Sequence, residues 1–269
     1  MNRLTVTVIT LNEERALPCA LASVRGLADE ILVVDSGSSD GTREMARAHG
    51  ARVLEHAWTD FSDQKNFAAA QAAHDWIFSL DADEELSPAL QEELRRWKET
   101  DPAAAAYEMP RRARYLGRWI RHSGWYPDYK RRLYRRDRAR FVGALHESLE
   151  VDGSVGRLQS DLYHHTFATL AEHRAQVEHY SRLTARALYA AGRRQWLLPL
   201  LVSPPWMFLR TYFWKLGFLD GAAGWHIARL TARTSYLKYA GLGRLVRGRA
   251  LEPEAAPRAA SLPTPPRTR

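Results

Sequence analysis

Over the first hundred residues, short runs of apolar and β-branched side chains alternate with segments in which apolar residues recur every three or four positions. Runs of the first kind are typical of strands buried on both faces, and segments of the second kind are typical of helices with one buried side. Because each strand is followed by a helix, the order predicts an α/β fold with a doubly wound, mainly parallel sheet. The predicted strands are 4–10, 30–35, 52–55 and 76–80, and the predicted helices are 12–25, 43–49, 62–73 and 88–98.

Beyond residue 107 the pattern changes to short basic and aromatic segments, then a long polar segment, then apolar segments interrupted by prolines. The longest uncharged run, 196–209, holds three prolines and is too short and too interrupted to span a membrane as a helix. Ser203-Pro204-Pro205 predicts a break between two apolar segments. The expected strands are 107–110, 114–120, 129–134 and 141–147, the polar helix is 170–193, and the apolar segments are 196–202 and 206–219.

The chain is therefore expected to have three parts. Residues 1–155 hold the predicted sheet, and residues 156–249 form a helical, amphipathic C-terminal extension. Residues 250–269 include five prolines and little that can form a core, so they are predicted to be a disordered tail.

Charge adds an expected partner to this organisation. The chain carries a formal net charge of +8, which implies affinity for nucleic acid, a lipid surface or a phosphorylated substrate. Between Arg186 and Arg249 there are eleven basic residues and one acid, Asp220, with aromatic residues among them. This composition favours contact with an anionic bilayer, and the alternative is a helical pair packed on the rest of the chain or in a dimer interface.

Cysteine use and the N-terminus indicate the compartment. The single cysteine, Cys19, excludes an internal disulfide and a cysteine-rich zinc site. The chain enters a predicted strand at once, so no signal peptide is expected. Both features favour a cytoplasmic location.

Polar and acidic residues gather where the predicted strands end. Asp81 and Asp83 follow the apolar strand 76–80, and two clustered carboxylates suit a hard divalent cation that also binds phosphate oxygens. Because ligands bind at the carboxyl ends of strands in open α/β sheets, such residues are expected to line one crevice. The other three clusters are 10–13, 35–38 and 64–66. No glycine-rich dinucleotide fingerprint and no Walker loop is present, which excludes those classes of nucleotide site.

Longer segments around these clusters resemble inverting, nucleotide-sugar-dependent glycosyltransferases of family 2, which have the GT-A fold. The resemblance rests on Val8-Ile9-Thr10-Leu11-Asn12-Glu13, on residues 31–42 and on residues 75–84. Downstream, the chain is similar to the branch that includes lipopolysaccharide core β-1,4-glucosyltransferases. That similarity rests on residues 121–128, 132–136, 145–147, 217–221 and 237–239.

The resemblance implies a role for each part of the crevice. It identifies residues 1–155 as the domain that binds the nucleotide sugar, with Asp35 accepting a hydrogen bond from uracil and Lys65 near the uridine. Glu147 is the first choice for the base that deprotonates the acceptor, and Asp128 is the second. His164-His165 has no partner at ligand spacing and is expected to be structural. The donor-binding residues are Thr10, Asn12, Glu13, Asp35, Ser36, Lys65 and Asp81; the metal ligands are Asp83, Asp81 and His146; and the acceptor-binding residues are Trp125, Arg121 and Arg132.

The expected activity is a metal-dependent transfer of a hexose, glucose from UDP-glucose, to a lipid-linked saccharide such as the lipopolysaccharide inner core, with Mg²⁺ or Mn²⁺ as the cation. The enzyme is then expected to be peripheral on the cytoplasmic face of the inner membrane. One alternative is an acceptor in another envelope polysaccharide or a protein. There are two alternatives of other classes. A nucleotidyltransferase usually has a glycine-rich basic loop after the first strand, and this chain has none. A nucleic-acid-binding protein is disfavoured because the acidic crevice would repel the phosphates of the nucleic acid.

Overall fold

The computed structural model describes residues 1–143 and 147–251. These residues form two compact units, one of Met1–Arg112 and Asp128–His164, the other of Ala113–Pro127 and residues 165–251. The predicted domains are continuous stretches of sequence with boundaries at residues 155 and 249. Each observed unit instead combines two separate segments of the chain. Almost all of the predicted tail, from residue 252, lies outside the described residues.

Within the described residues, a ten-stranded sheet has the order β3-β2-β1-β4-β8-β6-β12-β5, and β11 and β7 pair with β6. The α/β class is confirmed, with a refinement: β3-β2-β1-β4 are parallel, whereas β8 is antiparallel to β4 and β6 is antiparallel to β8. A separate antiparallel hairpin consists of β9 and β10. The strands are β1 (Leu4–Thr10), β2 (Glu30–Asp35), β3 (Arg52–Glu55), β4 (Trp76–Asp81), β5 (Glu84–Leu86), β6 (Ala106–Tyr115), β7 (Arg118–Trp119), β8 (Asp128–Arg135), β9 (Ala139–Val142), β10 (Ser148–Val151), β11 (Val155–Arg157) and β12 (Leu162–Phe167).

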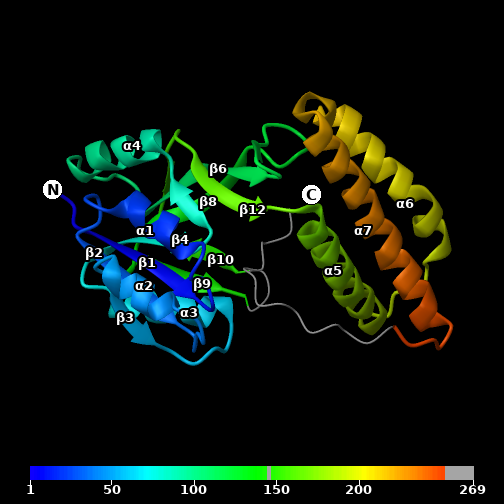
Figure 1. Ribbon diagram of the computed structural model, residues 1–269, viewed down its shortest axis with the longest axis horizontal. Helices are drawn as coiled ribbons and strands as arrows, with labels where there is room; N and C mark the ends of the chain where they lie inside the picture. Colours follow the sequence, from blue (N-terminus) through cyan, green and yellow to red (C-terminus); the bar gives the residue numbers. More distant parts are fainter. Residues whose placement is uncertain (144–146, 252–269) are drawn as a thin grey trace. The chain divides into compact units, whose positions relative to one another are not determined.

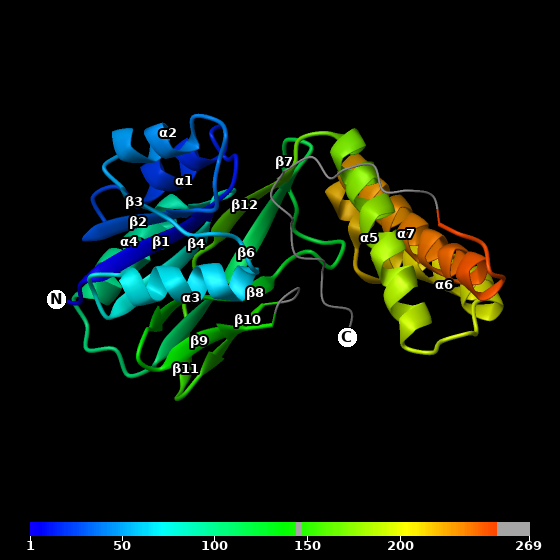
Figure 2. The same cartoon turned by 90° about the horizontal axis from the view of Figure 1, so that it is seen from below.

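Helices cover both faces of the parallel strands, because alternate side chains of each strand point to opposite sides (Figures 1 and 2). On β4, Phe78 and Leu80 join a core with residues of α1, α2 and α4, whereas Ile77 joins a second core with Ala69 of α3. The helices of this unit are α1 (Leu17–Val24), α2 (Thr42–Ala48), α3 (Phe61–Gln71) and α4 (Pro88–Lys98).

The first helix starts five residues later than predicted, at Leu17 instead of Asn12. Asn12 has a left-handed backbone with φ of 58°, which no α-helix continues. Its side-chain oxygen instead accepts a hydrogen bond from the backbone N–H of Ser39, at 2.9 Å. The polar residues before Leu17 therefore form a loop at the end of β1.

Three long helices make up most of the second unit: α5 (Leu170–Ala190), α6 (Leu197–Leu209) and α7 (Ala222–Val246). Both α5 and α6 pack against α7. The predicted break at Ser203-Pro204-Pro205 is wrong, because α6 continues through both prolines. Each proline removes one backbone hydrogen bond, and the packing of α6 along α7 keeps the helix continuous. A π-helical turn (Arg210–Trp214) and a 3₁₀ turn (Gly217–Asp220) then lead to α7.

Over residues 1–143 and 147–251, no helix is both long enough and apolar enough to cross a bilayer.

Candidate active site

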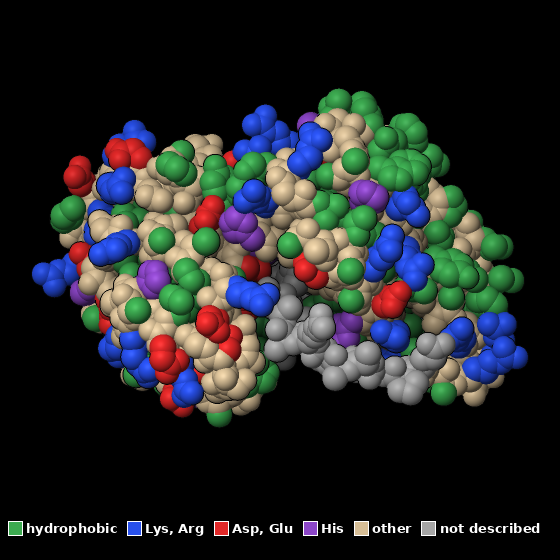
Figure 3. Space-filling model, in the orientation of Figure 1, with side chains coloured by type: hydrophobic (Ala, Val, Ile, Leu, Met, Phe, Trp, Pro, Cys, Tyr) green, Lys and Arg blue, Asp and Glu red, His purple; other side chains and the backbone are tan. Residues whose placement is uncertain are grey.

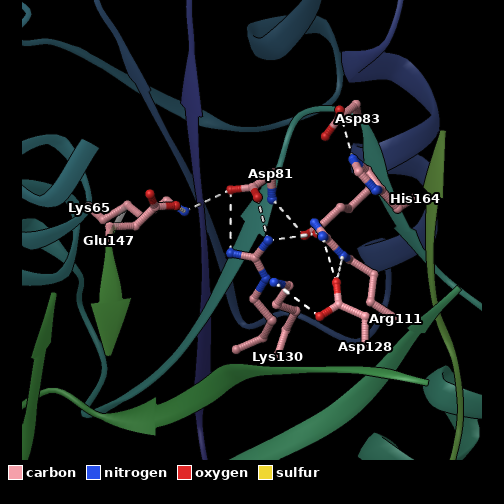
Figure 4. A network of polar contacts seen from close by, with 10 residues as sticks. Lys65, Asp81, Asp83, Arg111, Asp128, Lys130, Glu147 and His164 are labelled. Carbon is pink, nitrogen blue, oxygen red and sulfur yellow. Dashed lines mark hydrogen bonds and ion pairs between the residues drawn. The ribbon is translucent and has the colours of Figure 1, made fainter. Parts of the chain in front are cut away.

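The turn between β4 and β5 brings charged side chains together at the carboxyl end of the parallel strands (Figure 4). Asp81 is bound by two cations: Lys65 Nζ lies 3.0 Å from its Oδ1, and the Arg132 guanidinium contacts both carboxylate oxygens. Burial by itself would raise the pKa of Asp81, but the charges of Arg132 and Lys65 more than offset it and hold that pKa far below its usual range. Asp81 is therefore ionised at neutral pH.

Opposite charges alternate from Asp81 to Asp128 through the interior of this unit. Arg132 also donates to Glu84 Oε1 at 2.6 Å, and Arg111 donates to the same oxygen at 3.2 Å. Arg111 then binds Asp128 Oδ2 through two nitrogens, at 3.1 and 2.7 Å, and Lys130 Nζ lies 3.2 Å from Asp128 Oδ1. Burial alone would raise the pKa of Asp128, but Arg111 and Lys130 lower it overall.

Arg132, predicted to bind the acceptor, is 5% exposed and lies within this network of ion pairs. Its charge is directed at Asp81 and Glu84. The predicted acceptor role of Arg132 stays a prediction.

The structure adds one residue that the sequence patterns missed, His164 on β12. Its Nε2 lies 3.2 Å from Asp83 Oδ2, and both side chains are buried. Burial alone would raise the pKa of Asp83, but His164 more than offsets it and lowers that pKa. The contact arises because β12 pairs with β5 in a register that places His164 opposite Glu84. His164 is on the buried side of β12, but the sequence Leu-Tyr-His-His-Thr-Phe has no alternation of apolar and polar residues that would predict this strand, and only the pairing reveals the partner of His164.

Asp83 and His164 supply one carboxylate and one imidazole, both suitable ligands for a divalent cation. Within the described residues, no group of three or more His, Cys, Asp or Glu side chains is arranged to enclose a metal. Mg²⁺ in nucleotide enzymes is usually held by one or two protein groups together with phosphate oxygens and water, so the residues present fit such a shared cation. His146, the other predicted ligand, lies outside the described residues.

Glu147 lies on the other side of Asp81, joined to it through Lys65. Lys65 Nζ is 3.2 Å from Glu147 Oε1 and only 2% of the lysine side chain is exposed. The sequence pattern predicted a strand over 141–147, whereas β9 ends at Val142 and Glu147 directly precedes β10. β9 ends before Gly143, whose φ of 95° does not continue a strand.

The loops after β1 and β2 are joined by hydrogen bonds around Asp35. Its carboxylate accepts from Thr10 Oγ1 at 3.0 Å, from Ser38 Oγ, and from the backbone N–H groups of Gly37 and Ser38 at 3.1 and 2.8 Å. Four donors occupy the acceptor sites that a carboxylate offers, so Asp35 shapes this loop. Its predicted contact with uracil stays a prediction.

The remaining donor-site predictions fall on the same two loops. The backbone N–H of Asn12 donates to Ser38 Oγ at 2.8 Å, and that of Glu13 donates to Thr42 Oγ1 at 2.8 Å. The backbone N–H of Ser36 donates to Thr10 O at 2.9 Å. All three residues are partly exposed and lie at the carboxyl end of β1 and β2.

The other two predicted acceptor residues, Arg121 and Trp125, belong to the second unit. Asp220, 5% exposed, accepts from the backbone N–H groups of Arg121 and His122, both at 3.1 Å, and from Ser123 Oγ at 2.9 Å. The ring of Trp125 packs edge-on against Tyr115, with centroids 5.4 Å apart. Asp220 thus holds the loop that carries both predicted acceptor residues, a role that only the tertiary structure reveals.

Comparison with known families gives a match to the family described as "Glycosyl transferase family 2" over residues 5–162. A lipopolysaccharide core biosynthesis glycosyltransferase, LpsC of Rhizobium meliloti, is 31% identical over 257 residues, which cover 88% of this chain and 93% of the relative. An uncharacterized glycosyltransferase of Rickettsia typhi is 29% identical over 259 residues, which cover 91% of this chain and 88% of that one.

Two solved structures are similar at lower identity. Glucosyl-3-phosphoglycerate synthase from Mycobacterium tuberculosis, in complex with Mn²⁺, UDP and glucosyl-3-phosphoglycerate, is 18% identical with a TM-score of 0.43, covering 64% of this chain and 74% of that one. TarS residues 1–349 of S. aureus, in complex with UDP-GlcNAc, is 13% identical with a TM-score of 0.47 and 93% coverage of each chain.

Proposed function

The chain belongs to glycosyl transferase family 2, and from this premise we propose that it is an inverting hexosyltransferase that moves glucose from UDP-glucose to a lipid-linked saccharide such as the lipopolysaccharide inner core. Membership of this family means that the protein is a glycosyltransferase, so the nucleotidyltransferase and nucleic-acid-binding alternatives are set aside. The observation that best supports the proposed donor, acceptor and mechanism is the arrangement around Asp81. Lys65 binds both this carboxylate and Glu147, and Asp83, two residues later, contacts His164.

We assign the cation site to Asp83 and His164, with Asp81 beside them. A divalent cation bound there would neutralise charge that develops on the leaving diphosphate. The pKa of Asp83 is lowered, so its carboxylate is in the ionised form that binds a cation. Lys65 and Arg132 already balance the charge of Asp81, which favours Asp83 as the main carboxylate ligand.

Glu147 is the base in this proposal. Its carboxylate accepts the proton of the acceptor hydroxyl, whose oxygen forms a bond to the anomeric carbon as the bond from that carbon to the UDP oxygen breaks, with inversion. Asp128 is less suited, because two cations bind it and lower its pKa, which weakens it as a proton acceptor. Within residues 1–143 and 147–251, Glu147 is paired with one cation, Lys65.

The second unit supports an acceptor at a membrane surface. Large apolar side chains of α6 and the turns after it are exposed: Leu198 is 71%, Leu201 65% and Trp214 81% accessible. Figure 3 shows hydrophobic side chains gathered over this helix, with Lys and Arg side chains beside them. Apolar area of this kind with a basic border fits the interface of an anionic bilayer, so we propose peripheral association with the cytoplasmic face of the inner membrane.

Donor hydrolysis and transfer with a panel of UDP- and ADP-sugars, with and without EDTA, test the proposal. We expect turnover with a UDP-hexose, loss of turnover on chelation, and recovery when Mg²⁺ or Mn²⁺ is added. Full turnover in EDTA would contradict the metal assignment. Transfer to purified lipopolysaccharide core, another envelope polysaccharide or a protein identifies the acceptor class.

A binding measurement separates the cation site from catalysis. Asp83→Ala and His164→Ala should each weaken Mn²⁺-dependent binding of UDP by more than about tenfold in calorimetry, because each removes a ligand. Asp75→Ala, an exposed carboxylate paired with Arg136, is the matched control and should bind UDP like the wild type. If both site variants bind UDP with unchanged Mn²⁺ dependence, the cation site is elsewhere.

A further inference from the structure

One side of helix α3 contacts the chain on both sides of the 144–146 segment. Asn66 accepts from the backbone N–H of Phe141 at 2.8 Å and donates to its carbonyl at 2.9 Å. Ser62 Oγ donates to the carbonyl of Gly143 at 2.7 Å. Lys65 binds Glu147. Because residues at spacings of three and four share a helix face, these contacts come from one side of α3.

Lys65 is enclosed by three groups. Its Nζ lies 3.0 Å from Asp81 Oδ1, 3.2 Å from Glu147 Oε1 and 5.2 Å from the centroid of the Phe141 ring. A lysine with 2% of its side chain exposed has few rotamers, and its ammonium is compensated by both carboxylates. Figure 4 shows Lys65 and Glu147 side by side, with Asp81 reached from the same ammonium.

The bond to Lys65 uses one oxygen of Glu147. Among the described residues, Oε2 of Glu147 has no hydrogen-bond partner, whereas Oε1 is bound to Nζ. The side chain of Glu147 is 14% exposed, so it is not fully enclosed by the described residues. A carboxylate fixed at one oxygen and open at the other is arranged to accept a proton from a ligand.

We infer that Lys65 is a positioning residue for the base: by joining Glu147 to Asp81, it holds Oε1 of Glu147 and presents Oε2 to the acceptor hydroxyl. This inference rests on the proposed function, which makes Glu147 the base. It differs from the role that the family resemblance implied, in which Lys65 contacts the uridine of the donor. Misplacement of a reacting group by about 1 Å can cost about 100-fold in rate, so the loss of such a bridge should appear in kcat.

A double-mutant cycle of Lys65→Met and Glu147→Gln tests the inference. We expect Lys65→Met to lower kcat for transfer by about 100-fold while the Kd for UDP stays within about threefold of wild type. Because both residues then act as a unit, the double variant should be no slower than Glu147→Gln alone, within about threefold. Multiplicative losses in kcat, or a Kd for UDP raised in proportion to the loss of turnover, would overturn the inference in favour of direct donor contact.

Two further variants guard against a purely structural effect. Lys65→Arg keeps the charge and can bridge two carboxylates, so it should recover at least about tenfold of the lost kcat; an arginine variant as slow as Lys65→Met contradicts the inference. Lys98→Met is the matched control. Lys98, the last residue of α4, is also buried, and its ammonium lies 2.7 Å from Asp29, away from the site. It should lower stability and leave kcat unchanged. If Lys65→Met does not fold, Lys65→Gln replaces it in the same cycle.

The cycle also separates this inference from the proposed function. If Glu147→Gln retains wild-type kcat, the base assignment fails and the inference fails with it. If Glu147→Gln is slow but Lys65→Met adds an independent loss, only the positioning role is wrong.

Discussion

At the scale of single residues, the ion pairs around the turn after β4 decide which acids are able to do chemistry. Asp128 and Glu147 are both carboxylates near the site, and the sequence left the choice between them open. Arg111 binds Asp128 through two nitrogens and Lys130 binds its other oxygen, whereas Glu147 is bound at one oxygen by Lys65. A carboxylate held by two cations is a weaker proton acceptor, which favours Glu147.

The two isosteric amide variants of these acids should therefore behave differently. Glu147→Gln should lower kcat by about 1,000-fold, within the usual range for loss of a general base, with little change in the Kd for UDP. Asp128→Asn should mainly lower the free energy of unfolding, by about 1 kcal/mol, because it weakens a partly exposed pair with Arg111. Steady-state kinetics and urea unfolding of both variants measure this. A slow Asp128→Asn beside an active Glu147→Gln would reverse the assignment.

A second prediction at this scale concerns His173 of α5. Burial lowers the pKa of His173 to about 4, from an ordinary value of 6.5. Between pH 6.5 and about pH 4, His173 is protonated in the unfolded chain but neutral in the folded chain. The free energy of unfolding therefore falls as the pH drops through this window, and the effect levels off below it. At 1.36 kcal/mol for each pKa unit, the loss between pH 6.5 and 5 is about 2 kcal/mol.

His173→Phe removes the titrating ring but keeps an aromatic group beside Phe167, whose ring stacks on His173 with centroids 4.5 Å apart. Urea unfolding at pH 7 and pH 5 should show a smaller loss of stability for the variant than for the wild type. Equal losses in both proteins would mean that His173 is accessible to protons in the folded state.

At the scale of elements, helix α3 contacts both the parallel sheet and the β9–β10 hairpin. Ala68 of α3 packs on Leu32 and Val34 of β2, while Ser62 and Asn66 bind the backbone of the β9 strand and the residue after it. The predicted helix 62–73 agrees closely with the observed Phe61–Gln71, but nothing in its sequence shows that polar residues of one side bind a hairpin eighty residues later. Helix formation is local, whereas hydrogen bonds to the hairpin require the sheet.

Removal of the Asn66 contacts tests this role of α3. Asn66→Ala deletes two hydrogen bonds to Phe141, which should lower kcat for transfer by about tenfold because the residue before β10 is held less firmly. The Kd for UDP should not change. Gln91→Ala is a control in α4, where the amide donates to Leu86 O at 3.3 Å away from the hairpin. If Asn66→Ala and Gln91→Ala have the same kcat, the contacts of Asn66 are dispensable.

At the scale of the whole chain, the described residues form two compact units, and the exposed apolar side chains of α6 belong to the second. The ion-pair network, Asp83, His164 and Glu147 all belong to the first unit. The second unit contains α6. The predicted break at its prolines is wrong, and exposed apolar residues follow the whole length of the helix. A continuous helix presents its apolar residues along one side, which a broken segment would not.

Binding to lipid vesicles tests the surface of α6. Leu198→Ser with Trp214→Ser should weaken binding to vesicles with anionic lipid by at least about tenfold, because burying each such side chain contributes about 1.5–3 kcal/mol. Wild-type binding should also fall with added salt. Trp58→Ser, an exposed tryptophan of the first unit, is the control and should bind like the wild type. Unchanged binding of the double variant, or a dimer that it abolishes, would contradict membrane contact.

The sequence by itself determined the parallel strands β1–β4, strand β8, most helices and the acids at the strand ends, because strand and helix periods and the end of an apolar run are local properties. It did not predict β5, β10, β11 or β12. Asp81, Asp83 and Glu147 were found in this way or through family resemblance. Only the tertiary structure decided that His164 meets Asp83, that Lys65 joins Asp81 to Glu147, and that Arg111 and Arg132 neutralise the acids around them. These contacts join segments far apart in the chain. Those of His164 and Arg132 follow from the register of β5 with β12 and of β4 with β8, which no local pattern contains.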